Sequence, residues 1–247
     1  MRFCTGFGIL CLSFLVACKK DDRRDIRDFY FPVEDLRRGQ VYEYDLAQGD
    51  SSSPEYWYFR TFQRDSGVFL AGTYYDSRFQ IGQIIRQKVS EEGIFAREYS
   101  IYDPDFETGK QIQTTAIVES PEVYPFRVQD SVGVSVFSLH YQPATDPSTT
   151  IYLTRKRLFL GDAPDFEFQG DTYPCVRFGL LESVGTKKGG DDLLKGRGEE
   201  WYAKGLGLVY YKKTFGAKKS RVEFAYRLKD VFPMSELEKK AAAYFGE

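Results

Sequence analysis

The feature that most constrains the fold is an alternation of apolar and polar side chains with a period of two residues, which recurs from Gly39 onward. It is clearest in residues 221–228, where Val222, Phe224 and Tyr226 alternate with charged or small residues. Successive side chains of a β-strand point to opposite faces of the sheet, so this pattern predicts strands with one buried face. Aromatic residues make up 17% of the sequence, which also favours strands.

The same alternation predicts about a dozen strands. They are expected at residues 41–46, 55–64, 68–75, 79–89, 94–102, 111–118, 132–141, 150–160, 173–184, 199–203, 207–215 and 220–228. Short turn-like segments, such as residues 65–67, separate most of them. Parallel neighbours need long crossover connections, so short turns predict antiparallel pairing in sequence order. The predicted fold class is mostly β, with the strands arranged as a curved antiparallel meander.

One short helix is predicted at the C-terminal end. Ser235 and Glu238 have the spacing of a capping box, and Gly246 is a residue type that favours the end of a helix. The side chains expected to dock the helix on the sheet recur at four-residue steps, namely Leu237, Ala241 and Phe245.

The β-rich domain is expected to span residues 39–247. Pro121 and Pro125 mark either a boundary between two β halves or a bend between strands of one sheet, and the sequence leaves both interpretations open. Residues 187–192 are interpreted as a mobile hairpin loop.

Residues 1–17 are typical of a bacterial secretory signal peptide. The apolar run from Phe7 to Ala17 is about eleven residues long, whereas a membrane-spanning helix needs about twenty. Residues 15–18, Leu-Val-Ala-Cys, resemble the lipobox of bacterial lipoproteins, in which the cysteine is lipidated and becomes the first mature residue. The resemblance implies that Cys18 carries fatty-acyl lipid, such as palmitate, and holds the protein on a membrane.

Residues 18–38 begin with charges of both signs and few apolar side chains, so they are predicted to form a flexible tether. Lys20, Asp21 and Asp22 lie at its start. A lysine followed by two acidic residues resembles the export signal of Bacteroidota surface lipoproteins. This resemblance implies anchoring in the outer membrane with display on the cell surface, and the periplasmic leaflet is the alternative.

Residues 198–212 form the most distinctive motif of the chain, Gly-Glu-Glu-Trp-Tyr-Ala-Lys-Gly-Leu-Gly-Leu-Val-Tyr-Tyr-Lys. Gly205 and Gly207 favour a tight turn or bulge between two strands. The motif resembles a segment near the C-terminus of uncharacterised Bacteroidota lipoproteins, which implies a strongly curved sheet or half-barrel similar to that of periplasmic lipoprotein carriers. A phosphate-binding loop is disfavoured because no third glycine follows at the required spacing and no helix begins there.

Charge and cysteine content argue against a nucleic-acid-binding protein and against a domain stabilised by disulfides. Lys and Arg total 34 against 36 Asp and Glu, so no overall positive field attracts nucleic acid, and no nucleic-acid partner is expected. Cys175 is the only cysteine expected to remain free in the mature chain, as a small buried side chain. A domain without a disulfide depends on its hydrophobic core.

No catalytic residue, cofactor or metal site is predicted. His140 is the only histidine, and the alternation places it opposite Phe137 and Leu139, on a surface face. Glu199 and Glu200 are adjacent in a strand, so their side chains point to opposite faces and cannot flank one glycosidic bond.

Two further segments have a functional and a structural interpretation. Residues 103–107 alternate carboxylates, but Thr108 stands where a calcium loop needs glycine, so a plain turn is favoured. Exposed aromatics in residues 56–59, or at Tyr74 and Tyr75, would suit stacking on sugar rings, although strand propensity alone explains them.

These observations favour a non-enzymatic, lipid-anchored protein of the cell envelope that acts by binding or assembling partners, either an envelope protein or a glycan. One alternative is an enzyme that acts on envelope or polysaccharide material. Another is a carrier of an apolar ligand inside the half-barrel. Clustered carboxylates in a cleft would favour the enzyme, and an open apolar cavity would favour the carrier.

Overall fold

The computed structural model describes residues 23–47, 53–105, 108–129, 133–186, 194–216 and 221–246. The predicted signal peptide, the lipidation site Cys18, the export signal at Lys20, Asp21 and Asp22, and the loop at residues 187–192 lie outside these residues. In the part of the chain that is described, no helix has the length and apolar character needed to span a membrane.

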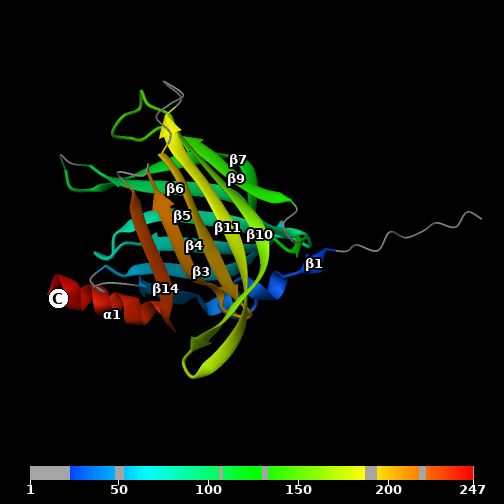
Figure 1. Ribbon diagram of the computed structural model, residues 1–247. Helices are drawn as coiled ribbons and strands as arrows, with labels where there is room; N and C mark the ends of the chain where they lie inside the picture. The colour runs from blue at the N-terminus through cyan, green and yellow to red at the C-terminus, as the bar shows by residue number, and fades with distance from the viewer. Residues whose placement is uncertain are drawn as a thin grey trace, which may run out of the picture.

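Twelve strands form one antiparallel barrel, each pairing with its neighbours along the chain (Figure 1). They are β2 (Gln40–Leu46), β3 (Glu55–Arg64), β4 (Gly67–Tyr75), β5 (Ile81–Val89), β6 (Gly93–Pro104), β7 (Gln111–Pro125), β9 (Val134–Tyr141), β10 (Ile151–Phe168), β11 (Asp171–Thr186), β12 (Leu194–Ala203), β13 (Gly207–Phe215) and β14 (Val222–Phe232). Each overlaps one predicted strand, so the alternation located all of them.

The barrel closes because its last strand pairs with its first. β14 runs antiparallel to β2, with Phe232 opposite Val41 and Tyr226 opposite Leu46. The predicted meander is therefore confirmed, but the half-barrel is wrong, because the sheet curves until its two edges meet. Figure 1 shows β10, β11 and β14 crossing in front of β3 to β6 at a steep angle. Closure leaves this sheet without an exposed edge.

The two prolines at residues 121 and 125 do not divide the domain. Both lie within β7, and the strands before and after that segment belong to the same closed barrel. The pairing of β7 with β9 shifts in register between Val118 and Ser120, next to the proline-containing part. A register shift of this kind bends a strand, so the second of the two interpretations holds.

The predicted tether is wrong for residues 23–38, which are folded. β1 (Arg24–Asp25) pairs with β8 (Arg127–Val128), and two short 3₁₀ helices follow, η1 (Arg27–Phe29) and η2 (Asp35–Arg38). Ile26, Tyr30, Phe31 and Leu36 are buried in the main core. The prediction from composition missed these apolar side chains because the segment begins with many charged residues.

The N-terminal segment fills space that the barrel wall cannot fill. A barrel of about eight strands is just wide enough for its own side chains to occupy the interior, so a barrel of twelve leaves a gap. Here residues 26–36 enter at one end and pack against inward-facing aromatics of the wall. We call this group of side chains, Tyr30 and Phe31 with Tyr42, Phe59, Tyr124 and Tyr202, the aromatic plug.

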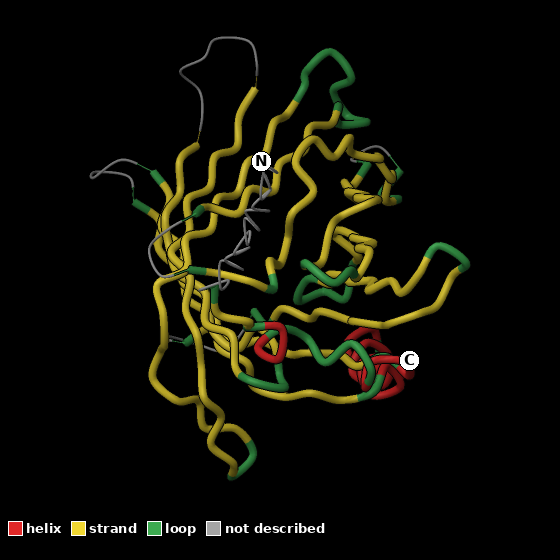
Figure 2. Tube along the Cα trace, turned by 90° about the vertical axis from the view of Figure 1, so that its right-hand side faces the viewer, coloured by secondary structure: helices red, strands yellow, loops and turns green. Residues whose placement is uncertain are grey.

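The C-terminal helix α1 (Met234–Phe245) lies outside the barrel wall (Figure 2). Pro233 occupies the N-cap position and no side chain caps the helix, so the predicted capping box at Ser235 and Glu238 is wrong. Gly246 ends the helix with a φ of 76°, as expected for a left-handed C-cap. Leu237 is buried against the outward-facing Val41, Tyr56 and Phe232, whereas Phe245 is 60% exposed.

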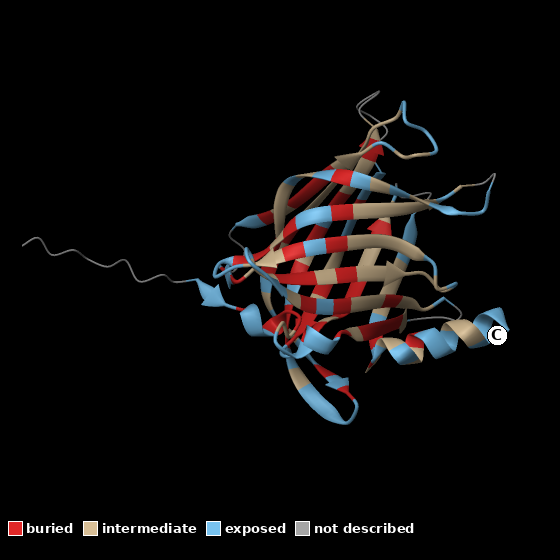
Figure 3. Cartoon of the chain, turned by 180° about the vertical axis from the view of Figure 1, so that it is seen from behind, coloured by how far each residue is buried: buried red, intermediate tan, exposed pale blue. Residues whose placement is uncertain are grey.

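Burial along the strands changes from one end of the barrel to the other. Phe224, Tyr226 and Leu228 share the inner face of β14 as predicted, yet only Leu228 is buried, and Val222 at the far end is 61% exposed. Figure 3 shows buried positions concentrated on the barrel strands and exposed ones at the hairpin tips and along α1. The alternation identifies which side chains face the barrel interior, but how far each one is buried depends on what fills the barrel at that level.

Candidate functional site

A cavity of about 250 Å³ lies inside the barrel, above the aromatic plug. Its apolar walls include Trp57 and Phe59, which stack with ring centroids 5.6 Å apart, together with Tyr74, Leu153 and Phe224. Trp57, Tyr74 and Phe224 are half-buried, so solvent reaches the cavity beside them. The site is therefore a hollow with aromatic sides inside an otherwise packed barrel.

The aromatic plug forms the floor of this cavity. The ring of Phe31 lies 3.9 Å from that of Phe59, and Tyr30 meets Tyr202 edge-on at 5.3 Å. Gly207, with a φ of 93°, lets Phe31 approach the turn before β13, because a Cβ at this position would lie 2.6 Å from the Phe31 ring. Gly205, with a φ of 78°, lies in the same turn, so the predicted tight turn between the two strands is confirmed.

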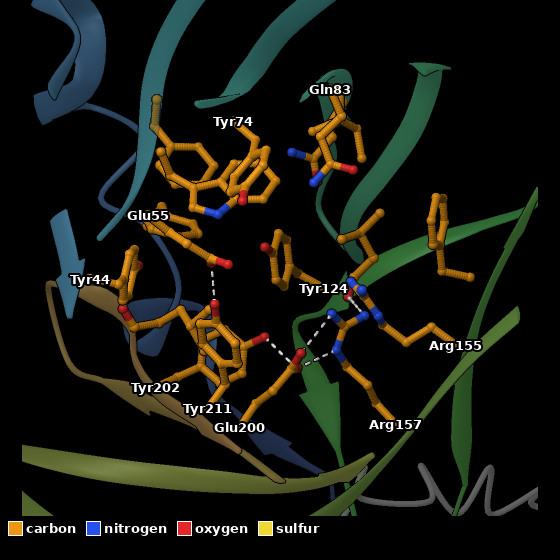
Figure 4. A pocket seen from close by; sticks show the side chains of 18 of the residues that line it. Tyr44, Glu55, Tyr74, Gln83, Tyr124, Arg155, Arg157, Glu200, Tyr202 and Tyr211 are labelled. Carbon is orange, nitrogen blue, oxygen red and sulfur yellow. Dashed lines mark hydrogen bonds and ion pairs between the residues drawn. The ribbon is translucent and has the colours of Figure 1, made fainter. Parts of the chain in front are cut away.

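A group of ion-paired side chains lies on the inner faces of four neighbouring strands, β10 to β13, and Figure 4 shows three of its members, Arg155, Arg157 and Glu200, beside the cavity. The group consists of Arg155, Arg157, Glu182, Glu200 and Lys213, and we call it the interior charge cluster. In each case the charged residue lies an even number of positions from buried apolar residues of its strand, so its side chain points to the same inner face.

Arg157 and Glu200 form the deepest pair, with side chains only 4% and 5% exposed. Nε of Arg157 donates to Oε2 of Glu200 at 2.6 Å, and Nη2 of Arg157 donates to Oε1 of Glu200 at 3.3 Å. Arg157 also donates to the carbonyl of Val123 at 3.3 Å, and the Tyr202 hydroxyl donates to Glu200 at 2.8 Å. The pair therefore satisfies most of its own hydrogen-bonding groups, as buried charges must.

Arg155, Glu182 and Lys213 form the second group of contacts, and Arg155 and Lys213 line the cavity. Arg155 faces Glu182 directly across β10 and β11, and its Nε donates to that carboxylate. Nζ of Lys213 lies 3.0 Å from the other oxygen of Glu182. The Glu182 side chain is 6% exposed, whereas that of Arg155 is 26% exposed. One carboxylate thus holds two cations at the cavity wall.

These contacts set the protonation states. Burial opposes the charge on Glu200, but Arg157 and Arg155 beside it hold its pKa at about 2. For Glu182, burial is likewise outweighed by Arg155 and Lys213, which lower its pKa. Burial and the neighbouring Arg155 lower the pKa of Lys213. Both carboxylates are therefore ionised at neutral pH.

The opposite wall of the cavity carries further polar groups. Burial raises the pKa of Glu55, which accepts a hydrogen bond from Tyr211. The hydroxyl of Tyr99 donates to Gln83. Gln87 is 1% exposed and lines the cavity, yet its side-chain oxygen has no hydrogen-bond partner. A buried polar atom without a partner is costly, so this wall offers an unused contact to a ligand.

The sequence-predicted residues are not brought together at one site. Glu199 and Glu200 point to opposite faces of β12, as expected, and only Glu200 is buried inside. His140 is on the polar face of β9, where Nδ1 lies 2.9 Å from Glu119, and its side chain is 25% exposed. It does not line the cavity.

The remaining predictions fall in different places. Cys175 is buried, and burial raises its pKa to about 11, in accord with a structural role. Asp105 accepts a hydrogen bond from Thr108 in the turn between β6 and β7. Among the described residues, no group of His, Cys, Asp and Glu side chains is arranged to hold a metal ion. Tyr56 is buried beneath α1 and Tyr74 lines the cavity, so these two aromatics do not form an exposed sugar-stacking surface.

The sequence analysis missed four members of the interior charge cluster, although the signal was present. In β10, Arg155 and Arg157 share parity with the apolar Leu153 and Phe159. The same holds for Glu182 in β11 and Lys213 in β13. Charges on the apolar face of several consecutive strands are a sign of a polar site inside a barrel.

The fold and site together define a closed antiparallel barrel with a partly plugged, partly hollow interior. No protein-family model matches the chain, and the search of curated proteins found no match. Two solved structures are similar to it. A candidate lipoprotein from Parabacteroides distasonis has a TM-score of 0.52 and 16% identity over 82% of this chain and 97% of its own. A candidate exported protein with a YmcC-like fold from Bacteroides fragilis has a TM-score of 0.50 and 14% identity over 82% of this chain and 98% of its own. At these identities the likeness establishes the shared fold.

Proposed function

We propose that the protein is a lipid-anchored envelope protein whose barrel binds a small ligand in its interior cavity. The observation that carries this proposal is the hollow of about 250 Å³ with Trp57, Tyr74 and Leu153 in its walls. Ligand sites are typically concave and mostly apolar, with a few polar groups that fix orientation. This cavity has both components, because the interior charge cluster lies along one wall.

Binding accounts for the site better than catalysis does. A general acid or base works best when its pKa is near the working pH. Glu200, with a pKa of about 2 and a tightly held arginine partner, is far from that condition. The role of the deep pair is therefore to hold the wall in place, which leaves the cavity suited to recognition.

Lipid anchoring in the cell envelope is supported by the lipobox-like residues 15–18 and by the two structural neighbours, which are described as a candidate lipoprotein and a candidate exported protein. The outer membrane is proposed as the site of anchoring from the resemblance of Lys20, Asp21 and Asp22 to an export signal. Acylation of Cys18 would tie the chain to the lipid five residues before residue 23, the first that the structure describes. Display on the cell surface would depend on Lys20, Asp21 and Asp22.

Ligand binding is tested by calorimetric titration with 2-naphthamide, a neutral aromatic probe. We expect saturable binding to the wild-type protein. Leu153→Trp adds volume inside the cavity and should abolish binding, whereas Leu181→Trp, at a position 60% exposed on the outer face of β11, should not. Circular dichroism verifies that both variants keep their strands. Absence of saturable binding, or equal binding by the two variants, would contradict the proposal.

Anchoring is tested in cells that incorporate labelled fatty acid. Cys18→Ala should lose the label completely, because no other acylation site is predicted. Replacing Lys20, Asp21 and Asp22 together by alanine should keep the label but reduce antibody staining of intact cells. Label retained in Cys18→Ala refutes the anchor, and unchanged staining in the triple variant refutes the export signal.

A further inference from the structure

We infer that the cavity takes an organic anion with an apolar body, and that Arg155 is the residue that recognises the acidic group. This inference rests on the proposed function, since it names the class of ligand that the same cavity would bind. The members of the interior charge cluster differ in how many of their hydrogen-bond donors are already in use.

Most hydrogen-bonding groups of the buried ion pair, Arg157 and Glu200, are already used within the protein. Arg157 gives hydrogen bonds to both oxygens of Glu200 and to the carbonyl of Val123. Its side chain is 4% exposed. Glu200 accepts from Arg157 and from Tyr202. These two residues line the cavity, but their hydrogen-bonding groups are largely satisfied by each other, by Val123 and by Tyr202.

Arg155 is different, because only its Nε donates to Glu182. Its two terminal nitrogens form no hydrogen bond with any described residue, and 26% of the side chain is exposed although it lies inside the barrel. A guanidinium group presents donors in a planar fork that matches the two oxygens of a carboxylate. The free part of Arg155 thus has the geometry of an anion-binding group.

The charge balance of the wall also favours an anion. Within the interior charge cluster, three cations, Arg155, Arg157 and Lys213, are held by two carboxylates, Glu182 and Glu200. The third carboxyl group at the cavity is Glu55, on the opposite wall, whose pKa is raised by burial. Lys213 must share Glu182 with Arg155. A further negative charge would leave each cation with a partner in a site of low dielectric constant, where such pairing is strongest.

The other walls indicate the rest of the ligand. Trp57 and Phe224 present apolar ring surface, and Leu153 adds aliphatic contact. Gln87 offers a side-chain oxygen without a partner, which suits a ligand with one hydrogen-bond donor. The volume of about 250 Å³ is just below the roughly 300–1,000 Å³ typical of drug-sized ligands, which favours a small acid.

The test compares 2-naphthoate with 2-naphthamide, which have the same ring system and nearly the same shape but differ in charge. At pH 7, calorimetric titration of the wild-type protein should give at least tenfold tighter binding of the naphthoate. Arg155→Gln should remove this preference while leaving the naphthamide affinity within about twofold of the wild type.

Two further variants separate charge recognition from general damage. Arg177→Gln removes an exposed arginine from β11, the strand that pairs with Arg155, and should leave the preference unchanged. Arg155→Lys keeps a cation beside Glu182 and should retain part of the preference. This conservative variant also covers the case in which Arg155→Gln does not fold.

The outcomes distinguish the two proposals. If both probes bind with equal affinity, the anion inference is wrong while the ligand-binding function stands. If neither binds, the proposed function fails and the inference fails with it. If the wild type prefers the naphthoate and Arg155→Gln or Arg155→Lys keeps the full preference, the recognition does not belong to Arg155.

Discussion

The two ends of the barrel interior are built on the same strands but are filled in opposite ways. At one end, residues 26–36 insert Tyr30 and Phe31 among wall aromatics, and this level is closely packed. At the other end no segment of the described chain enters, and the wall carries the interior charge cluster around a hollow. The inward side chains of a wide barrel do not fill its interior by themselves. The inserted segment, residues 26–36, therefore determines which end of the barrel is packed and which end has space for a ligand.

The largest effect should come from truncating the aromatic plug. Phe31 is 3% exposed and packs on Phe59 and Tyr42, so Phe31→Ala should lower the free energy of unfolding by about 3–5 kcal/mol. Urea denaturation measures this. Tyr30→Phe is the control, since the Tyr30 hydroxyl is buried without a partner and its removal should cost nothing. A loss under about 1 kcal/mol for Phe31→Ala would remove the distinction between the two ends.

The next effect concerns the deep ion pair. Arg157→Leu leaves Glu200 buried without its main partner, so we expect a loss of about 3 kcal/mol in the free energy of unfolding. The double variant Arg157→Leu with Glu200→Leu should regain most of that loss, because neither charge is then left unpaired. Denaturation of the wild type, the two single variants Arg157→Leu and Glu200→Leu, and the double variant measures the coupling. A double variant less stable than the single one would show that the pair stabilises the hollow end directly.

A smaller effect should appear in the pH dependence of stability. The pKa of Glu200 is lowered from 4.5 to about 2 in the folded protein, so its contribution is fully present above 4.5 and is lost as the pH falls towards 2. Between about pH 5 and pH 3 this amounts to roughly 2 kcal/mol. Thermal melts of the wild type and Glu200→Gln across this window should show a larger acid-dependent loss in the wild type, because Glu182 and other carboxylates with lowered pKa values remain in the variant. Parallel curves would contradict the assignment.

The smallest effect is expected beside the cavity. Phe224 is half-buried and borders the hollow, so Phe224→Ala should cost about 1 kcal/mol, well below the same truncation at Phe31. Glu223→Ala, on the outer face of β14, should leave the unfolding midpoint unchanged. Equal losses at Phe31 and Phe224 would mean that both ends are packed alike.

The strands and their antiparallel order could be predicted from the local sequence pattern. The period-two pattern is local, so it located every barrel strand, placed Glu200 and Glu199 on opposite faces, and put the turn at Gly205 and Gly207. It also indicated the C-terminal helix, although not its first residue, since Pro233 rather than Ser235 holds the N-cap position. In each case the deciding interactions lie within a few residues of one another.

Closure of the barrel, the filling of its interior and the assembly of the interior charge cluster depend on contacts between distant parts of the chain. Pairing of β14 with β2 joins residues about 180 positions apart, and the burial of Tyr30 and Phe31 depends on wall aromatics that come much later in the chain. Arg155 and Lys213 form one site because four strands bring their inner faces together. A two-residue period states which side of a strand faces inward. Whether that side meets a packed core, a charged partner or an empty space depends on how many strands close the barrel and on what else enters it.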